Sequence, residues 1–97
     1  MTKTTERAIR REKFAKRVGQ NLRRVRRAAG LSQDTLAYVA EVHRTEVSQI
    51  ERGTRLPGAY TLWKFAQCLD AEPGELLAGL TWHAPGSGSG RLEVTED

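Results

Sequence analysis

The chain has little of what a disulfide-stapled or membrane-spanning protein requires. Cys68 is the single cysteine among 97 residues, so no disulfide can form within the chain, which suits a reducing compartment. No apolar run reaches the length needed to cross a bilayer, and the first residues lack the apolar stretch of a secretory signal. We therefore expect a soluble, cytoplasmic protein.

Catalytic and metal-binding patterns are equally scarce. The two histidines, His43 and His83, lie forty residues apart, and Cys68 falls in an apolar stretch typical of a buried thiol. The sequence contains neither a metal-ligand cluster at a recognised spacing nor a glycine loop that cradles phosphate. We expect a protein that is not an enzyme and that uses no metal or cofactor.

What the chain does have is an uneven distribution of charge. The net charge is only +4, but residues 1–27 hold eleven Lys or Arg against two Glu, a balance of +9. The remaining seventy residues hold five basic and ten acidic side chains, a balance of −5. This asymmetry favours contact between the N-terminal segment and a polyanion. The alternative is an ordinary solvated basic helix face.

Apolar residues recur at helical spacing from Phe14 onward. The repeat predicts a first helix that ends at Gly30, a residue typical of helix C-termini. Its start is open between Thr5 and Phe14, because Gly19 weakens a long helix. Pro73 suits a first helical position. We predict an all-α, compact five-helix bundle whose later helices cover about 32–40, 44–52, 59–69 and 73–80.

The composition changes after Trp82. Residues 85–90 have the Pro, Gly and Ser content of a flexible linker. Leu92 and Val94 alternate enough for a short strand if a partner edge exists, but a disordered acidic tail is favoured. The predicted organisation is a basic extension over 1–13, a helical domain over 14–82, and a flexible linker with an acidic tail over 83–97.

The segment from Gly30 to Gly53 carries the strongest functional signal. It predicts two short helices joined by a tight turn at 41–43. The second helix carries four polar side chains on faces that its apolar residues leave free. They are of the types that read base edges in a DNA major groove, with a solvated polar surface as the alternative: Arg44, Thr45, Ser48 and Gln49.

These helices and their spacing resemble the Xre family of DNA-binding proteins, which includes the lambdoid phage repressors and Cro proteins. The resemblance covers about residues 15–80. It implies a lambda-repressor-like domain with a helix-turn-helix at its second and third helices, binding two-fold operator DNA as a homodimer and acting as a transcriptional repressor. Its most specific pieces are Gly30-Leu-Ser-Gln33, Leu36-Ala37, Val47-Ser-Gln-Ile-Glu-Arg-Gly53, Pro57 and Pro73-Gly-Glu-Leu-Leu77.

The resemblance also implies which residues meet DNA bases. Arg44, Thr45 and Gln49 match the positions that most often reach base edges, and Ser48 lies within reach of the duplex. Gln33 is expected at the groove edge, on a phosphate or a terminal base.

A second group is expected on DNA phosphates. Ser32 opens the second helix, where its hydroxyl also suits an N-cap. His43 replaces the family's usual Ser or Thr cap and is expected to donate to a phosphate. The loop after the third helix resembles the family's backbone-contacting loop through Arg52, Thr54 and Arg55. The N-terminal segment is expected to add contacts as a flexible arm or a helical extension, through Arg7, Arg10, Arg11, Lys13, Lys16 and Arg17.

Three further positions are structural expectations of the resemblance. Glu51 is expected to pair with Arg26 and to hold the third helix against the first. Glu41 stands in the turn where the family commonly has Gly at positive φ, a departure that costs on the order of 1 kcal/mol.

The family places its dimer surface on the last helices or the C-terminal end. The candidates there are Tyr60, Trp63, Leu80 and Trp82, with a place in the domain core as the alternative. Alternatives to a homodimeric repressor are an antitoxin whose segment after Trp82 binds a toxin, a protein-interaction module that does not bind DNA, and a polyanion binder without sequence preference.

Overall fold

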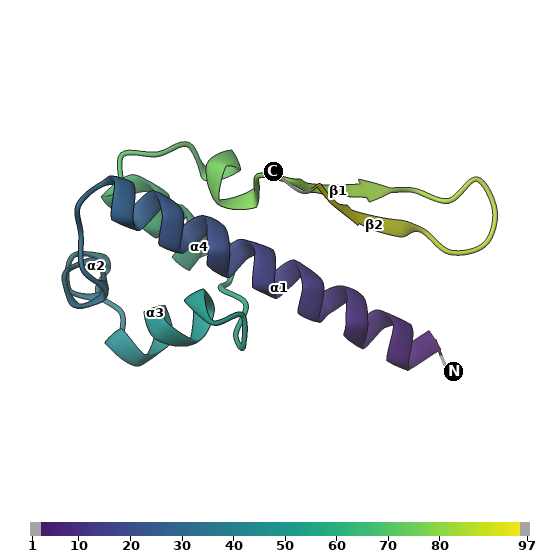
Figure 1. Cartoon of the computed structure of the whole chain (residues 1–97), viewed down its shortest axis with the longest axis horizontal. Helices are drawn as coiled ribbons and strands as arrows, with labels where there is room; N and C mark the ends of the chain where they lie inside the picture. Colours follow the sequence, from purple (N-terminus) through teal and green to yellow (C-terminus); the bar gives the residue numbers. More distant parts are fainter. Residues whose placement is uncertain (1–2, 96–97) are drawn as a thin grey trace.

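The longest element of the computed structural model is a helix of 26 residues, α1 (Lys3–Ala28), along which the other elements are arranged (Figure 1). The structure describes residues 3–95. Three shorter helices follow in order: α2 (Gln33–Ala40), α3 (Arg44–Glu51) and α4 (Ala59–Cys68). The first turns of α1 project beyond the helical body, and the molecule measures 44 × 23 × 22 Å. No helix within residues 3–95 is long and apolar enough to cross a membrane.

The core lies where the C-terminal half of α1 meets the three shorter helices. Each element presents one apolar stripe at helical spacing, and the stripes meet in a single cluster. Fully burying a side chain of this size contributes about 1.5–3 kcal/mol. The largest fully buried apolar members are Phe65, Leu22, Leu36, Ile50, Leu76, Val18 and Val47.

Gly19 lies in the middle of α1, and the helix continues through it without a break. A Cβ at this position would sit 2.3 Å from the carbonyl oxygen of Ile50 and 2.7 Å from that of Glu51. The glycine therefore permits the backbones of α1 and α3 to touch. The start that the sequence left open lies at Lys3, so the basic N-terminal segment is a helical extension.

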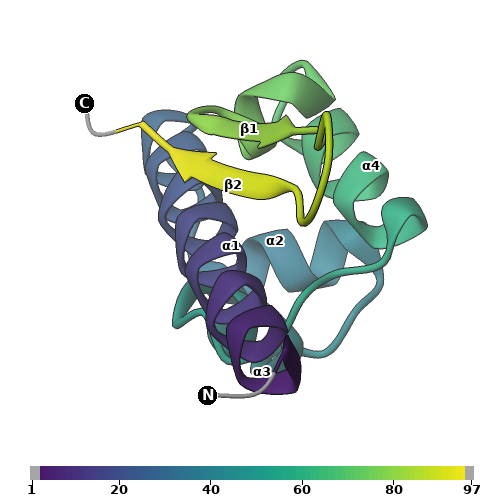
Figure 2. The same ribbon diagram turned by 90° about the vertical axis from the view of Figure 1, so that its right-hand side faces the viewer.

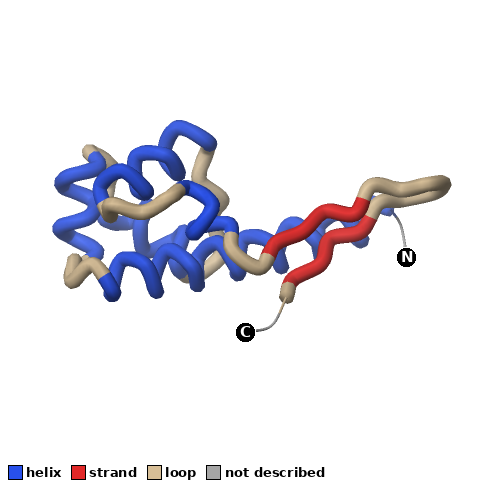
Figure 3. Tube along the Cα trace, turned by 90° about the horizontal axis from the view of Figure 1, so that it is seen from above, coloured by secondary structure: helices blue, strands red, loops and turns tan. Residues whose placement is uncertain are grey.

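The predicted fifth α-helix is wrong. Pro73–Leu77 form a short 3-10 helix, η1, and the chain then turns at Gly79, whose φ is +82°. The next residues form a strand, β1 (Leu80–His83), which pairs antiparallel with β2 (Arg91–Val94). The fold is therefore mostly helical rather than all-α, with four α-helices, the 3-10 turn and a C-terminal hairpin among the described residues (Figure 3).

The disordered tail that the sequence favoured is wrong over Arg91–Val94. The partner edge that a strand needed is supplied by β1, with Leu80 opposite Val94 and Trp82 opposite Leu92. Leu92 and Val94 are half-buried on the side of β2 that faces α1. The last two residues of the expected tail, Glu96 and Asp97, lie outside the described residues.

The hairpin lies beside the N-terminal half of α1 (Figure 2). Arg17 of α1 donates from Nε to the carbonyl of Ala78 at 3.2 Å and from Nη2 to that of Thr95 at 2.6 Å. Asn21, fully buried one turn further on, donates to the carbonyls of Leu76 and Ala78. These hydrogen bonds satisfy backbone carbonyl oxygens at the end of η1, just before β1 and just after β2.

Candidate nucleic-acid interface

The turn between α2 and α3 has the geometry that a helix-turn-helix requires. Glu41 adopts φ 57° and ψ 47°, the left-handed conformation, and its N–H donates to the carbonyl of Tyr38 at 3.2 Å. The next N–H, of Val42, donates to Ala37 at 3.0 Å. A carboxylate residue thus occupies the conformation that Gly adopts most easily, and the cost is on the order of 1 kcal/mol.

The two helices begin differently. Ser32 caps α2, because its Oγ accepts a hydrogen bond of 3.0 Å from the N–H of Thr35. His43 occupies the N-cap position of α3 with an exposed side chain that makes no capping hydrogen bond. The first backbone N–H groups of α3 therefore have no side-chain cap, and anions are favoured at such a helix end.

A buried carboxylate joins α1, α2 and α3. The Glu51 side chain is fully buried, and the Arg26 side chain is only 9% exposed. Arg26 donates to it from Nε at 2.6 Å and from Nη2 at 2.9 Å, a bidentate pair. Gln33 adds a bond of 3.0 Å, and Arg23 one of 3.4 Å. One charged group thus fixes the first three helices relative to one another.

The surroundings of this carboxylate favour its ionised form. Burial alone would raise the pKa of Glu51, but hydrogen bonds from Arg26, Gln33 and Arg23, with the positive charge of Arg26, together lower the pKa below its ordinary value. The hydrogen bond from Arg26 to Glu51 correspondingly raises the pKa of the guanidinium.

Gln33 belongs to this structural network as well as to the predicted DNA edge. Its side chain is half-buried, and its Nε2 donates to Glu51. The sequence placed it at the groove edge alone and did not anticipate this bond. The side chain therefore links the start of α2 to the end of α3.

The exposed edge of α3 carries the residues expected to read bases. Thr45 is exposed, and Ser48 and Gln49 are half-buried. The Arg44 side chain is 65% exposed, and its Nε lies 2.9 Å from Oδ1 of Asp34 on α2. Exposed pairs of this kind contribute only about 0.2–1 kcal/mol, so the pair holds the Arg44 guanidinium only weakly.

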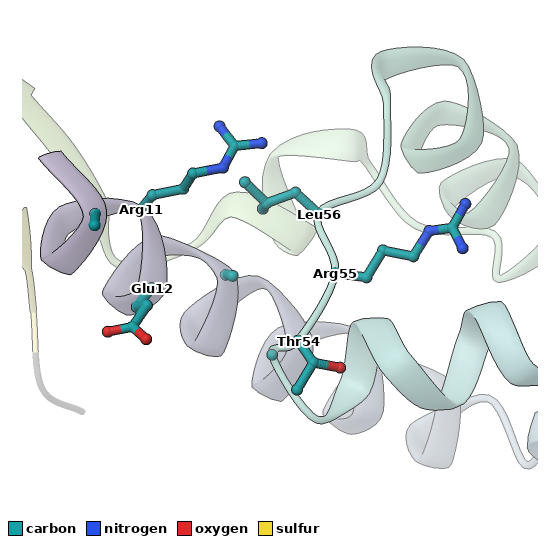
Figure 4. Close-up of a pocket in the computed structure, with 8 residues that line it drawn as sticks. Arg11, Glu12, Thr54, Arg55 and Leu56 are labelled. Atoms are coloured by element: carbon teal, nitrogen blue, oxygen red, sulfur yellow. The ribbon is translucent and has the colours of Figure 1, made fainter. Parts of the chain in front are cut away.

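The loop after α3 lies against both this edge and α1. Arg55 donates to the Gln49 side chain at 3.4 Å and approaches Glu46 at 3.9 Å, while the Thr54 hydroxyl donates to the Gln49 carbonyl. Thr54 and Arg55 share a hollow with Arg11 of α1 (Figure 4).

Gly53 brings a second cation of α1 to the same loop. It adopts φ +77°, and a Cβ there would sit 2.9 Å from Cα and Cγ of Lys16. Lys16 and Arg52 are both exposed. Two cations of α1, Lys16 and Arg11, therefore border the loop expected to meet phosphates.

The structure divides the basic residues of α1 into two groups. Arg17 is buried and bonds to Ala78 and Thr95, so we remove it from the phosphate-contacting set. Arg10 donates to the Gly90 carbonyl at 3.3 Å and lies 5.6 Å from the centre of the Trp82 ring. Both arginines hold the hairpin on α1, a role that the sequence did not indicate because the hairpin was not expected.

The four aromatic and apolar residues expected at a dimer surface do not form one patch. Tyr60 and Trp63 stack on the outer face of α4 with ring centres 6.3 Å apart, and they are 68% and 50% exposed. Leu80 instead packs against the core cluster. Trp82, on β1, lies under the guanidinium of Arg10.

A comparison with protein families identifies this arrangement. The model of the helix-turn-helix family HTH_3 matches residues 22–76, more than half of the chain. The chain therefore belongs to the HTH_3 family of helix-turn-helix proteins.

Individual relatives agree with this assignment. Control protein C.BamHI of Bacillus amyloliquefaciens is 38% identical over 60 residues, which span 61% of this chain and 74% of that protein. The HTH-type transcriptional regulator y4dJ of Sinorhizobium fredii is 37% identical over 62 residues, 64% of this chain and 80% of that protein.

Solved structures give the same result. The restriction-modification controller protein C.AhdI of Aeromonas hydrophila superposes with a TM-score of 0.62 at 44% identity, over 64% of this chain and 94% of that chain. An HTH_3 family transcriptional regulator of Vibrio cholerae gives a TM-score of 0.66 at 34% identity, over 70% of this chain and 38% of that chain. The protein is a DNA-binding transcriptional regulator, homologous to restriction-modification controller proteins, and not an enzyme.

Proposed function

We propose that the chain binds a two-fold DNA site as a homodimer, reads its bases with α3 and represses transcription by occupying the site. The observation that carries the proposal is the contrast between the two ends of α3. Its C-terminal end is fixed by the buried Glu51 pair, while its N-terminal edge at Arg44 and Thr45 is exposed. A rigid helix with a free polar edge suits entry into a major groove.

The proposed contacts follow from side-chain chemistry. Arg44 pairs bidentately with N7 and O6 of a guanine, and Gln49 with N6 and N7 of an adenine. The methyl group of Thr45 packs on a thymine, and Ser48 donates to a base or a phosphate. Gln33 meets the groove edge while it bonds to Glu51. The phosphate contacts come from Ser32, His43, Arg52, Thr54 and Arg55.

The proposed dimer surface is the outer face of α4. Tyr60 and Trp63 present a stacked aromatic pair to solvent, with Nζ of Lys64 4.7 Å from the Tyr60 ring. An apolar groove of about 220 Å³, lined in part by Leu56, Leu62 and Leu77, opens beside the start of the same helix. Exposed aromatic residues next to an apolar groove are typical of an interface.

Selection of bound duplexes from a random library at physiological salt tests the proposal. We expect a two-fold site with half-sites about one helical turn apart, or roughly 34 Å, bound by a species of two chains in sedimentation. Replacing Tyr60 and Trp63 by Ser should give monomers and weaken binding. Recovery of no preferred sequence, or binding that unrelated duplex competes away equally, would contradict the proposal.

A second, more specific candidate function is control of a restriction-modification system. C.BamHI is named a control protein and C.AhdI a restriction-modification controller protein, and on that basis we infer that this chain controls the genes of a restriction-modification system. Genes for a methyltransferase and an endonuclease beside its own, with the selected site upstream of them, would support this role. The antitoxin alternative relied on a free segment after Trp82, but Arg91–Val94 pair with β1, so we do not favour it.

A further inference from the structure

Two segments at opposite ends of the chain lie outside the matched family region and lie together in space. The family model covers residues 22–76, and C.AhdI is covered over 94% of its length by only 64% of this chain. The whole N-terminal half of α1 and the β1–β2 hairpin are outside the family match. They lie side by side in the fold (Figures 2 and 3).

The contacts between these segments are specific. Near the hairpin loop, Arg10 donates to the carbonyl of Gly90 and lies over the Trp82 ring. A Cβ on Gly90 would meet Cζ2 of Trp82 at 2.3 Å, so the indole lies directly on that backbone. At the other end of the hairpin, Arg17 bonds to Thr95, whose N–H donates to the Gly79 carbonyl at 2.8 Å.

Neither segment is expected to be stable alone. A helical overhang of about eleven residues is marginal in water without tertiary contacts, and an isolated two-stranded hairpin is marginal as well. Their stability therefore depends on each other, because the hairpin contacts Arg10 and Arg17 on one face of α1.

The hairpin leaves other cations of α1 exposed. Arg7, Arg11, Lys13 and Lys16 remain accessible to solvent. Arg11 lines the hollow that also contains Thr54 and Arg55 (Figure 4). Lys16 borders Gly53. Glu12 lines the same hollow and offsets part of the charge. The exposed cations thus continue the surface of the loop after α3.

We propose that residues 6–17 of α1, held rigid by the hairpin Leu80–Thr95, form a basic arm that binds the DNA backbone beyond the loop after α3. The partner is the phosphate backbone of the duplex whose bases α3 reads, so this inference rests on the proposed function. Twelve helical residues span about 18 Å, the length of roughly five base-pair steps of about 3.4 Å. The cations of α1 make the contacts, and the hairpin is the positioning element that keeps this part of α1 helical.

The test measures affinity against salt concentration for the full chain on its selected site and on an unrelated duplex. Arg11→Gln with Lys16→Gln removes two cations next to the loop. We expect the slope of log K against log salt to fall by about 1.8 per bound subunit, and affinity at about 150 mM salt to fall at least about tenfold on both duplexes. The matched control, Arg91→Gln, removes one positive charge from the hairpin without altering α1 and should retain the wild-type slope.

The positioning role of the hairpin needs variants that keep the cations of the surface. Trp82→Ala with Leu92→Ala removes two hairpin side chains that lie against α1 and keeps every cation of α1, Arg10 included. We expect faster amide exchange over residues 6–13, an unchanged melting temperature of the helical body, and a slope reduced nearly as far as in the Arg11, Lys16 double variant. If the hairpin only stabilised the fold, the variant would speed amide exchange over residues 6–13 but would leave the slope of log K against log salt unchanged.

The outcomes separate this inference from the proposed function. An unchanged slope in the Arg11, Lys16 double variant, with specific binding intact, would overturn the arm and leave the proposed function standing. An unchanged slope in the Trp82, Leu92 variant would overturn the role of the hairpin. Absence of specific binding by the wild-type chain would instead contradict the proposed function itself.

Discussion

The carboxylate of Glu51 on α3 is held by the guanidinium of Arg26 on α1 at 2.6 and 2.9 Å, with both side chains almost completely removed from solvent. Gln33 brings α2 to the same carboxylate. Glu51 lies seven residues after Arg44, at the opposite end of α3. The orientation of the exposed edge therefore depends on a buried charge that does not itself reach the surface.

Glu51→Ala should destabilise the fold before it affects recognition. The substitution leaves the Arg26 guanidinium buried without its partner, a loss of about 3–5 kcal/mol. Urea unfolding measures the change directly, with Glu93→Ala on the exposed side of β2 as a control for loss of a carboxylate. A variant that kept wild-type stability yet lost DNA binding would show that Glu51 acts in recognition instead.

Acid should weaken the fold through the same group. The pKa of Glu51 is lowered in the folded state from its ordinary value of 4.5. The ionised form is therefore favoured on folding, so its stabilisation is complete above about pH 4.5 and is lost as the pH falls through the folded-state pKa. Melting temperatures measured from about pH 6 to about pH 2 should fall less steeply for Glu51→Gln than for wild type. Identical slopes would contradict this assignment.

Gly19→Ala should destabilise the protein although Ala is the better helix former. Helix propensity alone favours Ala by about 1 kcal/mol. The added Cβ would meet the backbone carbonyls of Ile50 and Glu51 at 2.3 and 2.7 Å, and overpacking against backbone costs about 1–3 kcal/mol. Gly74→Ala, where a Cβ meets nothing within 4 Å, is the control. Equal or greater stability of Gly19→Ala would refute the close contact of α1 with α3.

Much of the fold could be predicted because helical periodicity and terminal residues act locally. The repeat from Phe14, the Ser32 cap and the stop at Gly30 are local signals, and α2, α3 and α4 form close to the predicted bounds. Gly19 made a long first helix look unfavourable in the sequence. The glycine is required there by a close contact with α3, more than thirty residues away in sequence. Propensity describes a residue's own backbone and carries no information about such a contact.

The hairpin was not predicted for a similar reason, because each strand depends on a partner that is distant in sequence. Each strand has four residues, and Leu92 with Val94 gives too short an alternation to predict a strand. The sequence did contain a signal for the hairpin. Leu80 and Trp82 alternate before a Pro- and Gly-rich loop, and Leu92 and Val94 alternate after it, and these four residues are paired in the structure. Missing it left Arg10 and Arg17 among the expected phosphate contacts.

Asp34→Asn should strengthen binding to any duplex. Asp34 holds Arg44 at 2.9 Å on the exposed edge and repels phosphate. Removing this carboxylate frees Arg44, and an exposed pair of about 0.2–1 kcal/mol corresponds to a gain of roughly 1.4- to fivefold in affinity per subunit. Fluorescence titration with unrelated duplex measures it. Asp70→Asn, which removes the same charge beyond α4, should change affinity less, and equal effects would indicate net charge alone.

The most direct test of base reading by α3 is a double-mutant cycle between Arg44→Ala and single base-pair changes in the selected site. The account predicts a coupling of about 1–3 kcal/mol at one base pair of each half-site and none elsewhere. Arg55→Ala in the same titration should weaken all site variants alike. Coupling of Arg44 to no base pair, with uniform weakening across every site variant, would contradict the account.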